Sequence, residues 1–503
     1  MIIQEAKSIM LALAIMGLGL AASFFVNPIM VWGVVFVLAV GINVLGSPQT
    51  LLKTYIIWSA VSPLILLIIS GPFAFIDEAL VLGCVIVLVG NFTIRRQFPF
   101  KNKAMLTTLG LLYFTTFVSL VFNRSPLFPF ANAILTYFSF PVVFIFAYWF
   151  RSEKLIKWFL FMAGFFLFVQ IALNAGWKLG VNLLPNKHAF VGNFQDMDHG
   201  SLDSAQWVGY AMIWILILFL AMARHLQKKW RYLAYFGALI SIIQFRYTFT
   251  NHAYLYLILC VGCFIVVISR NFGSIFRHAS VVGLVLIAFY TLSESFDTAS
   301  QENYGARTNF SKENLIFRFN KFVHAPKMQL IHKVSVEWVE TNPSRWIIGM
   351  GAGNGTSSVG MARVSPGAYE LLADYYLTQT GVDERHGQSI MESTYSGLVS
   401  LWSEVGIVGY LLFQILCLIP FLRVWKLVRR GSYWNRYQRI LAESFVPAML
   451  LYFISSFLTD AYYLDFWIVT MWTWAGLVYD PLPREDDPVS SDGEKISDVA
   501  LAV

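Results

Sequence analysis

The chain has little charge. Only 13% of its 503 residues are Asp, Glu, Lys or Arg, about half of the roughly 25% found in an average soluble domain. Four cysteines in a chain of this length argue against a disulfide-rich secreted domain. What is abundant is apolar: 57% of the residues are hydrophobic and 17% aromatic. The composition argues against a soluble enzyme and a disordered protein, and it predicts an all-α polytopic membrane protein.

Long apolar runs recur along the chain. A helix needs about 20 mostly apolar residues to cross a bilayer. The region 51–94 also carries Pro and acidic residues, so one of its two predicted spans is open to being broken or interfacial. Fourteen spans are predicted, at 8–25, 29–46, 51–70, 77–94, 104–122, 131–150, 157–175, 205–223, 231–249, 252–269, 279–295, 396–422, 440–459 and 462–479.

The distribution of basic residues predicts the orientation. Cytoplasmic loops of membrane proteins are enriched in Lys and Arg. With the N-terminus inside, 23 of the 36 basic residues fall in cytoplasmic segments. We therefore expect both termini in the cytoplasm, and the net charge of +7 reflects topology and not a nucleic-acid partner. The short outer loops hold four basic residues: Arg124, Lys178, Lys187 and Arg246.

The spans divide the chain into four regions. Residues 1–295 hold the first eleven spans, and 396–479 hold the last three. Between them, 296–395 form one large outer segment. The tail at 480–503 is acidic and rich in Ser and Pro, so we expect it to be disordered.

The outer segment has its own local pattern. A structureless loop of about 100 residues is improbable, so short helices are expected in it. The run 328–340 has apolar residues near helical spacing, and Asn342-Pro343 should end that helix. The GMGAGNG stretch at 349–355 should form a turn-rich loop. It follows no βαβ pattern, which argues against dinucleotide binding.

The polar residues expected on the outer face suit an anionic substrate. The sequence has no HExxH motif, no P-loop and no Cys/His metal cluster. Arg is a favoured phosphate ligand because its planar group makes two parallel hydrogen bonds. Arg246, near the outer end of the span 231–249, either snorkels to the interface or binds a lipid-linked phosphate or pyrophosphate.

Acidic residues and a His precede the span 396–422. His386 is either solvent-facing or part of a titrating cluster with neighbours that include Glu392. A His or Glu can act as a general base on a sugar hydroxyl. Glu404 falls in the early turns of that span, where the interface and the helix dipole tolerate a carboxylate.

Four stretches on or beside the predicted outer face carry a recognisable pattern. They are VGNFQDMDHGSLDSAQWVGYAM, YTFTNHAYLYL, RFNKFVHAPKMQLIHKVSVEWVETNPSRWIIGMGAGNG and ESTYSGLVSLWSEVGIVGYLLF. In order and topology they resemble stretches of bacterial O-antigen ligases and Wzy-type polysaccharide polymerases. The short turn, two further spans, the large outer loop and the return into the membrane follow in the same order, and the resemblance covers roughly 176–478.

This resemblance implies a GT-C-like, metal-independent glycosyltransferase of the bacterial plasma membrane that needs no cofactor. It would transfer a glycan from an undecaprenyl-pyrophosphate donor to an acceptor sugar hydroxyl and invert the anomeric centre. Membrane lipids and a chain-length regulator would be its further partners. Arg246 and Arg318 would bind the pyrophosphate. The supporting loop residues would be Gly349, Gly351, Gly353 and Glu404.

The chain departs from the family pattern in two places. Asn251 stands where the family's turn has Arg, and Arg246 would substitute from five residues upstream. No His occupies the family's base position near 392–395, so Glu392 or His386 would be the base. The missing His favours a polymerase over a ligase.

Other functions stay open. A ligase or a protein O-oligosaccharyltransferase would differ only in its acceptor. A polysaccharide or lipid transporter should have internal repeats and charges within its spans, and such charges are few here. A non-catalytic scaffold would need none of the outer Arg residues. Polymerisation of repeat units into O-antigen, capsule or exopolysaccharide is the preferred interpretation.

Overall fold

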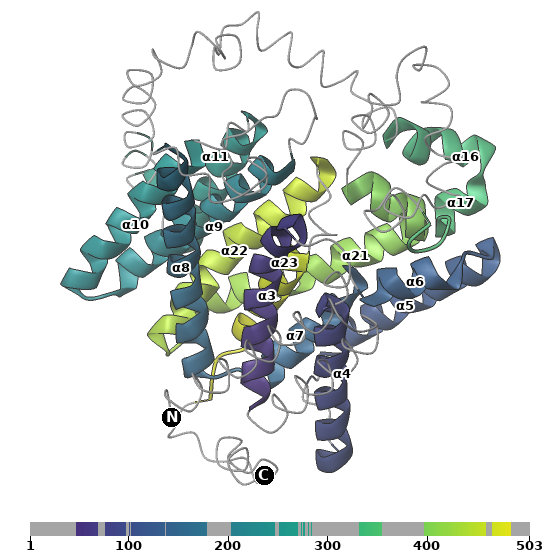
Figure 1. The fold of residues 1–503 in the computed structure, drawn as a ribbon, viewed down its shortest axis with the longest axis horizontal. Helices are drawn as coiled ribbons and strands as arrows, with labels where there is room; N and C mark the ends of the chain where they lie inside the picture. Colours follow the sequence, from purple (N-terminus) through teal and green to yellow (C-terminus); the bar gives the residue numbers. More distant parts are fainter. Residues whose placement is uncertain are drawn as a thin grey trace, which may run out of the picture.

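A computed structural model describes much of the chain. The described residues are 47–68, 76–96, 100, 102–135, 137–178, 203–246, 251–269, 331–354, 397–458 and 465–483, with isolated positions between 273 and 283. Regular structure in these ranges is helical and includes no strand (Figure 1). The all-helical prediction is therefore confirmed for this part of the chain. The predicted spans 8–25 and 29–46 lie outside the described residues, as does nearly all of 279–295.

Helices occupy the remaining predicted spans. Three helical stretches, Lys103–Asn123, Leu127–Trp149 and Leu398–Arg430, are long and apolar enough to cross a membrane. Shorter apolar helices accompany them. The helices are α3 (Pro48–Ile68), α4 (Ile76–Arg95), α5 (Lys103–Asn123), α6 (Leu127–Leu135), α7 (Phe140–Trp149), α8 (Glu153–Lys178), α9 (Asp203–His225), α10 (Lys228–Arg246), α11 (Asn251–Ile268), α16 (Trp338–Thr341), α17 (Pro343–Ile348), α21 (Gly397–Arg430), α22 (Arg436–Leu458) and α23 (Asp465–Val478).

Two predicted spans differ from the structure. The span 131–150 is divided between α6 and α7, which a 3-10 turn at Tyr137–Ser139 separates. Pro141, at the start of α7, explains the division, because proline lacks an N–H and disfavours helix in the residue before it. The span 396–422 continues as helix to Arg430, and basic residues at a helix C-terminus are favoured by its dipole.

The outer segment contains the predicted short helix. It runs from 331 to Thr341, including a π-helical turn at Lys333–Glu337, and ends at Asn342 as expected. Pro343 then begins α17, a position where its fixed φ is favourable. The residues from 349 to 354 form turns, which agrees with the prediction for the glycine-rich stretch.

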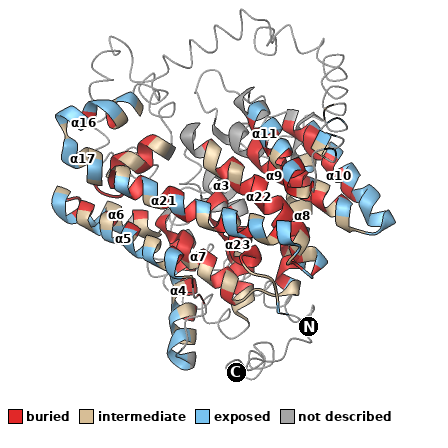
Figure 2. Cartoon of the chain, turned by 180° about the vertical axis from the view of Figure 1, so that it is seen from behind, coloured by how far each residue is buried: buried red, intermediate tan, exposed pale blue. Residues whose placement is uncertain are grey.

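The core lies where α7, α21, α22 and α23 meet. Phe140 packs on Trp472 with ring centroids 4.6 Å apart, and Phe144 packs on Tyr479 at 5.3 Å. Figure 2 shows that buried residues dominate α22, α23 and α9, whereas α5, α6 and α10 expose much of their surface. The exposed residues include large aromatic rings such as Phe114 on α5. Such apolar outer faces suit contact with lipid.

Several of the predicted cytoplasmic segments within the described residues lie together at one place, here called the basic end. Arg423 of α21 forms an ion pair with Asp480, next to Tyr479. Asn102, which caps α5, donates to the Tyr479 hydroxyl. Further contacts join this end to the starts of α8 and α22 and to the α9–α10 turn. The basic residues involved are Arg151, Lys157, Arg224, Arg423, Arg436 and Arg439.

Two helices connect the basic end to the far side of the molecule. From Arg423 back to Gly406, α21 covers about 26 Å at 1.5 Å per residue. From Asn102 to its C-cap at Arg124, α5 covers a similar length. This distance is close to the roughly 30 Å thickness of the hydrocarbon core of a bilayer.

Candidate functional site

A glycine-rich loop, Gly349–Asn354, follows α17 and contacts the N-terminal part of α21. We call it the glycine loop. Its backbone pairs with α21 in two places. The Met350 N–H donates to the Ser403 carbonyl at 2.7 Å, and the Gly351 N–H donates to the Glu404 carbonyl at 2.9 Å. These acceptors are available because Gly406 has non-helical angles and interrupts the helix there.

Glu404 also holds the loop through its side chain. It is fully buried, and its Oε2 atom accepts a hydrogen bond from the Gly353 N–H at 2.8 Å. A hydrogen bond between a carboxylate and a backbone N–H is about twice as strong as a neutral one. Glu404 is therefore enclosed where the loop and α21 meet, and its carboxylate is bonded within the protein.

The end of α5 holds the other side of the glycine loop. The Asn123 side-chain amide donates to the Gly349 carbonyl at 2.9 Å, and the Ser125 hydroxyl donates to the Met350 carbonyl at 2.8 Å. Ser119, one turn earlier, donates to the Glu404 carbonyl at 3.2 Å. These three polar side chains, two from α5 and Ser125 just after its C-cap, therefore connect both the loop and the interrupted part of α21.

Two glycines allow the backbones to approach closely. Gly349 has φ +74° and Gly406 has φ +69°, a region that disfavours other residues. A Cβ atom on Gly349 would overlap the backbone of Glu404, and one on Gly406 would overlap the carbonyl of Ile347. The loop and α21 thus touch through main-chain atoms on both sides.

A small apolar cluster covers the loop. Met350 packs with Val334, Trp338 and Val399, all of them buried. Trp346 of α17 accepts a hydrogen bond at its carbonyl from the Trp402 indole at 3.2 Å. The short helices of the outer segment are thereby attached to the first turns of α21.

Most N–H groups of the glycine loop are used inside the protein. Those of Met350, Gly351 and Gly353 donate to α21, and the Asn354 N–H donates to the Gly351 carbonyl at 3.0 Å. A phosphate-binding loop instead points its N–H groups at the ligand. The glycine loop therefore acts as a structural clamp, and these four N–H groups are not directed at a ligand.

One cation lies directly at the clamp. Arg124, between Asn123 and Ser125, is exposed and has φ 50° and ψ 40° as the C-cap of α5. Its N–H bonds to the Leu120 and Val121 carbonyls, which fixes this backbone conformation. The Arg124 side chain thus begins at a point held rigidly against the glycine loop.

The predicted site residues fall into two groups. The structure brings Gly349, Gly351, Gly353 and Glu404 into one junction. Arg246 is the last residue of α10, and its side chain lies outside the described residues. The other three predicted residues, Arg318, His386 and Glu392, also lie outside them.

Sequence reasoning missed the contribution of α5, which precedes the region of family resemblance. A signal was present: Asn123, Arg124 and Ser125 form a polar group between an apolar run and Pro126. Arg124 is also one of the few basic residues predicted in the short outer loops. In the part of the chain that the structure describes, no three His, Cys, Asp or Glu side chains are grouped to hold a metal.

Comparison with known proteins adds no relative. No protein-family model matches the chain, and no curated protein matches it.

Proposed function

We propose that the protein is a metal-independent membrane glycosyltransferase that polymerises undecaprenyl-pyrophosphate-linked repeat units at the outer face of a bacterial plasma membrane. The observation that carries the proposal is the junction between the glycine loop and Glu404. Gly353 and Glu404 are 51 positions apart, in two separate stretches that resemble the polymerase family, and they share a buried hydrogen bond. Such a contact is expected if both stretches support one site.

The arrangement of charge supports an outer location for this site. The junction lies at the end of α5 and α21 away from the basic end. If the basic end faces the cytoplasm, the junction faces outward. The full proposal is a GT-C-like fold with fourteen spans and a large outer loop.

The junction also limits where the proposed base can act. The segment 355–396 leaves the glycine loop at Asn354 and returns at Gly397, the first residue of α21. Glu392 precedes Gly397 by five residues, and a fully extended chain of that length spans at most about 18 Å. His386 is on a longer tether. Chain length thus favours Glu392 as the base that deprotonates the acceptor hydroxyl.

The outer Arg residues would stabilise the leaving group. Negative charge builds on the pyrophosphate as the glycosidic bond to it breaks, and fixed cations lower the energy of that transition state. We assign this role to Arg246 and Arg318, and we add Arg124 because the clamp fixes its backbone. Arg can supply the charge without a metal ion.

A reconstitution experiment tests the proposal. The purified protein in liposomes is given undecaprenyl-pyrophosphate-linked repeat units together with EDTA, and the glycans are separated by size. A ladder of polymers is expected. Arg318→Ala should abolish the ladder, and Glu392→Gln should do so more completely than His386→Ala.

Gene deletion separates the alternatives in cells. Single repeats on the final acceptor indicate a polymerase. Lipid-linked polymer that accumulates without transfer indicates a ligase, and repeat units that stay on the inner leaflet indicate a flippase. Normal polymer from inserted Arg246→Ala and Arg318→Ala variants would contradict the assignment.

A further inference from the structure

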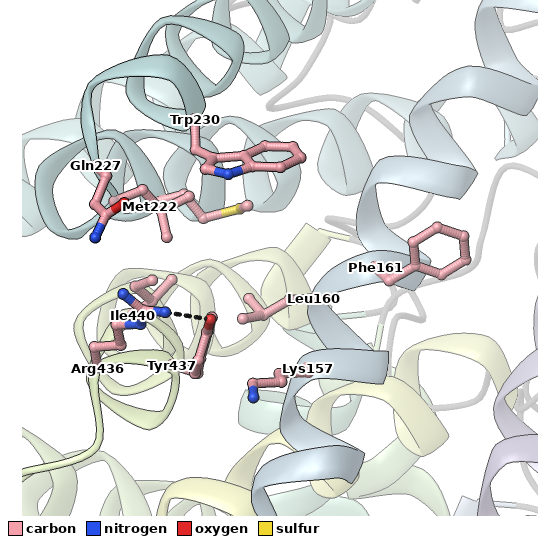
Figure 3. A pocket seen from close by; sticks show the side chains of 10 residues that line it. Lys157, Leu160, Phe161, Met222, Gln227, Trp230, Arg436, Tyr437 and Ile440 are labelled. Carbon is pink, nitrogen blue, oxygen red and sulfur yellow. Dashed lines mark hydrogen bonds between the residues drawn. The ribbon is translucent and has the colours of Figure 1, made fainter. Parts of the chain in front are cut away.

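A pocket lies at the basic end, far from the glycine loop. It opens between α8, the α9–α10 turn and α22, and has a volume of about 340 Å³ (Figure 3). Lys157 and Arg436 form a basic side. Leu160, Phe161, Met222 and Trp230 form an apolar side, and Ile440 lies one turn along α22 from Arg436 (Figure 3).

The two cations flank one aromatic ring. The Lys157 Nζ atom and the Arg436 Cζ atom each lie 4.7 Å from the centroid of the Tyr437 ring. Arg436 also donates a hydrogen bond to the Tyr437 hydroxyl at 2.7 Å, drawn in Figure 3. Cation–π contacts of this kind hold both charges at the wall of the pocket.

Cations outnumber carboxylates around this pocket. Glu153 forms an ion pair with Lys157 and accepts a hydrogen bond from the Asn435 amide at 2.6 Å. The bond from Lys157 is the largest of the effects that hold the pKa of Glu153 below its usual value, so Glu153 is ionised at neutral pH. Its negative charge offsets the positive charge of one cation, Lys157. Three more exposed cations follow on the α10 side, at Lys228, Lys229 and Arg231.

The apolar side of the pocket continues along the exposed surface of α8 and α10. Phe161 is 66% exposed and Trp230 is 62% exposed, although both are large and apolar. They begin two rows at helical spacing that run along α8 and α10 away from the basic end. The further exposed members of these rows are Phe165, Phe168, Leu233 and Phe236.

We propose that this pocket binds the phosphate head group of an anionic phospholipid, whose acyl chains lie along the two apolar rows. Basic pockets between membrane helices on the cytoplasmic side suit such head groups. A soluble phosphate would need the cations but not the adjoining exposed aromatics. The bound lipid would bridge α8 and α10 to α22. The proposal is independent of glycosyl transfer, since it uses only residues of the basic end and of the exposed surfaces of α8 and α10.

Lipid retention by the purified full chain tests this assignment. The protein in detergent is mixed with equal amounts of phosphatidylglycerol and phosphatidylcholine, and bound lipid is counted by native mass spectrometry over a concentration series. Phosphatidylglycerol should be preferred. Lys157→Gln and Arg436→Gln should each weaken its binding about fivefold, and the double variant about 30-fold.

Matched variants control for charge alone. Lys426→Gln and Arg430→Gln remove exposed cations of α21 that do not line the pocket, and should leave retention unchanged. Equal retention of both lipids, or a double variant that binds like wild type, would overturn the proposal.

Two further measurements cover the remaining outcomes. Because Lys157→Gln also breaks the ion pair with Glu153, Phe161→Ala and Trp230→Ala test the apolar side without touching that pair. Both should weaken phosphatidylglycerol binding. Displacement of the lipid by an equal concentration of inorganic phosphate, with no effect of the aromatic variants, would show a soluble-anion site and reject the lipid.

Discussion

Two buried carboxylates at opposite ends of the molecule are held in different ways. Glu404, fully buried, accepts a backbone N–H from Gly353. Glu443, 1% exposed, contacts two arginines and a histidine: Arg224 at 3.3 Å, Arg439 at 3.1 Å and His225 at 2.8 Å. Each of the hydrogen bonds described at the glycine-loop end uses a main-chain N–H or carbonyl group, whereas the contacts of Glu443 at the basic end join charged or titratable side chains.

This difference has consequences for tolerance to change. Close contacts between main-chain atoms need a particular backbone path and leave no room for a side chain. The junction is therefore rigid, and we expect it not to tolerate larger residues at its glycines. Charged side chains can reorient, and their neighbours can partly replace them. The first kind of structure suits a site that must hold reacting groups in register, and the second suits a surface that meets lipid head groups.

The largest effect is expected from adding a methyl group at the junction. Gly349→Ala and Gly406→Ala place a Cβ atom inside the backbone of the opposing segment, so the loop must leave α21. Both variants should lose polymer formation, and their melting temperature should fall sharply. Polymer ladders and thermal unfolding of the purified proteins measure this.

Gly431→Ala is the matched control. Gly431 has the same φ of +69° but no atom within 4 Å of an added Cβ. Its substitution should cost only the left-handed backbone strain, roughly 1–2 kcal/mol, and should leave activity intact. Equal losses for Gly431→Ala and Gly406→Ala would mean that strain, not main-chain contact, governs the junction.

Replacing each buried carboxylate by an amide should separate the two ends. Glu443→Gln leaves Arg224 and Arg439 without a carboxylate partner, and because both are about a third exposed it should cost about 2 kcal/mol, the scale of a lost hydrogen bond to a charged group. Glu404→Gln keeps an oxygen that can accept from Gly353 and should cost about 1 kcal/mol. Chemical unfolding of both variants in the same detergent measures the difference. Equal costs, or a larger cost for Glu404→Gln, would contradict the inference that the two carboxylates are held in different ways.

A smaller and more specific effect is expected at Arg124. If it contacts the pyrophosphate, Arg124→Ala should lower polymer formation about 10- to 100-fold, the equivalent of one hydrogen bond to a charged group. Arg124→Lys should restore part of the activity. Stability should hardly change, because the side chain is exposed.

Arg96 supplies a closely matched control. It follows α4 with φ 52°, is exposed, and belongs to a predicted cytoplasmic segment. Arg96→Ala therefore changes the same side chain on the same backbone conformation. Comparable loss of activity in Arg96→Ala and Arg124→Ala would remove Arg124 from the proposed site.

Local patterns account for what could be predicted from the sequence. Apolar runs of about 20 residues predict helices because a bilayer offers no water to the backbone, and a helix satisfies its N–H and C=O groups within the run, between residues four positions apart. The end of the outer helix at Asn342-Pro343 followed from the same kind of local rule. The grouping of the glycines with Glu404 came from the order of motifs, not from periodicity.

Contacts between distant residues account for what could not be predicted. Asn123 reaches the Gly349 carbonyl across 226 positions, and nothing near Asn123 in the sequence indicates that partner. The burial of Glu404 depends in the same way on a loop N–H 51 positions away. The sequence shows an acidic residue early in an apolar helix, but it does not show which group bonds to that residue.

The smallest effect concerns Glu153 at the basic end. The bond from Lys157 lowers its folded-state pKa, so the ionised carboxylate stabilises the protein above the unfolded pKa of about 4.3. That contribution is lost as the pH falls through the lowered value. Because Glu153 is 40% exposed, Glu153→Gln should cost only a few tenths of a kcal/mol at pH 7.

The pH dependence makes this small effect measurable. The melting temperatures of wild type and Glu153→Gln should differ slightly at pH 7 and converge in acid. Glu340→Gln, an exposed carboxylate of α16, is the control and should match wild type at pH 7. A large loss in Glu153→Gln would mean that the basic end, like the glycine loop, depends on single contacts. A small loss of stability agrees with a basic end that several charged side chains hold together.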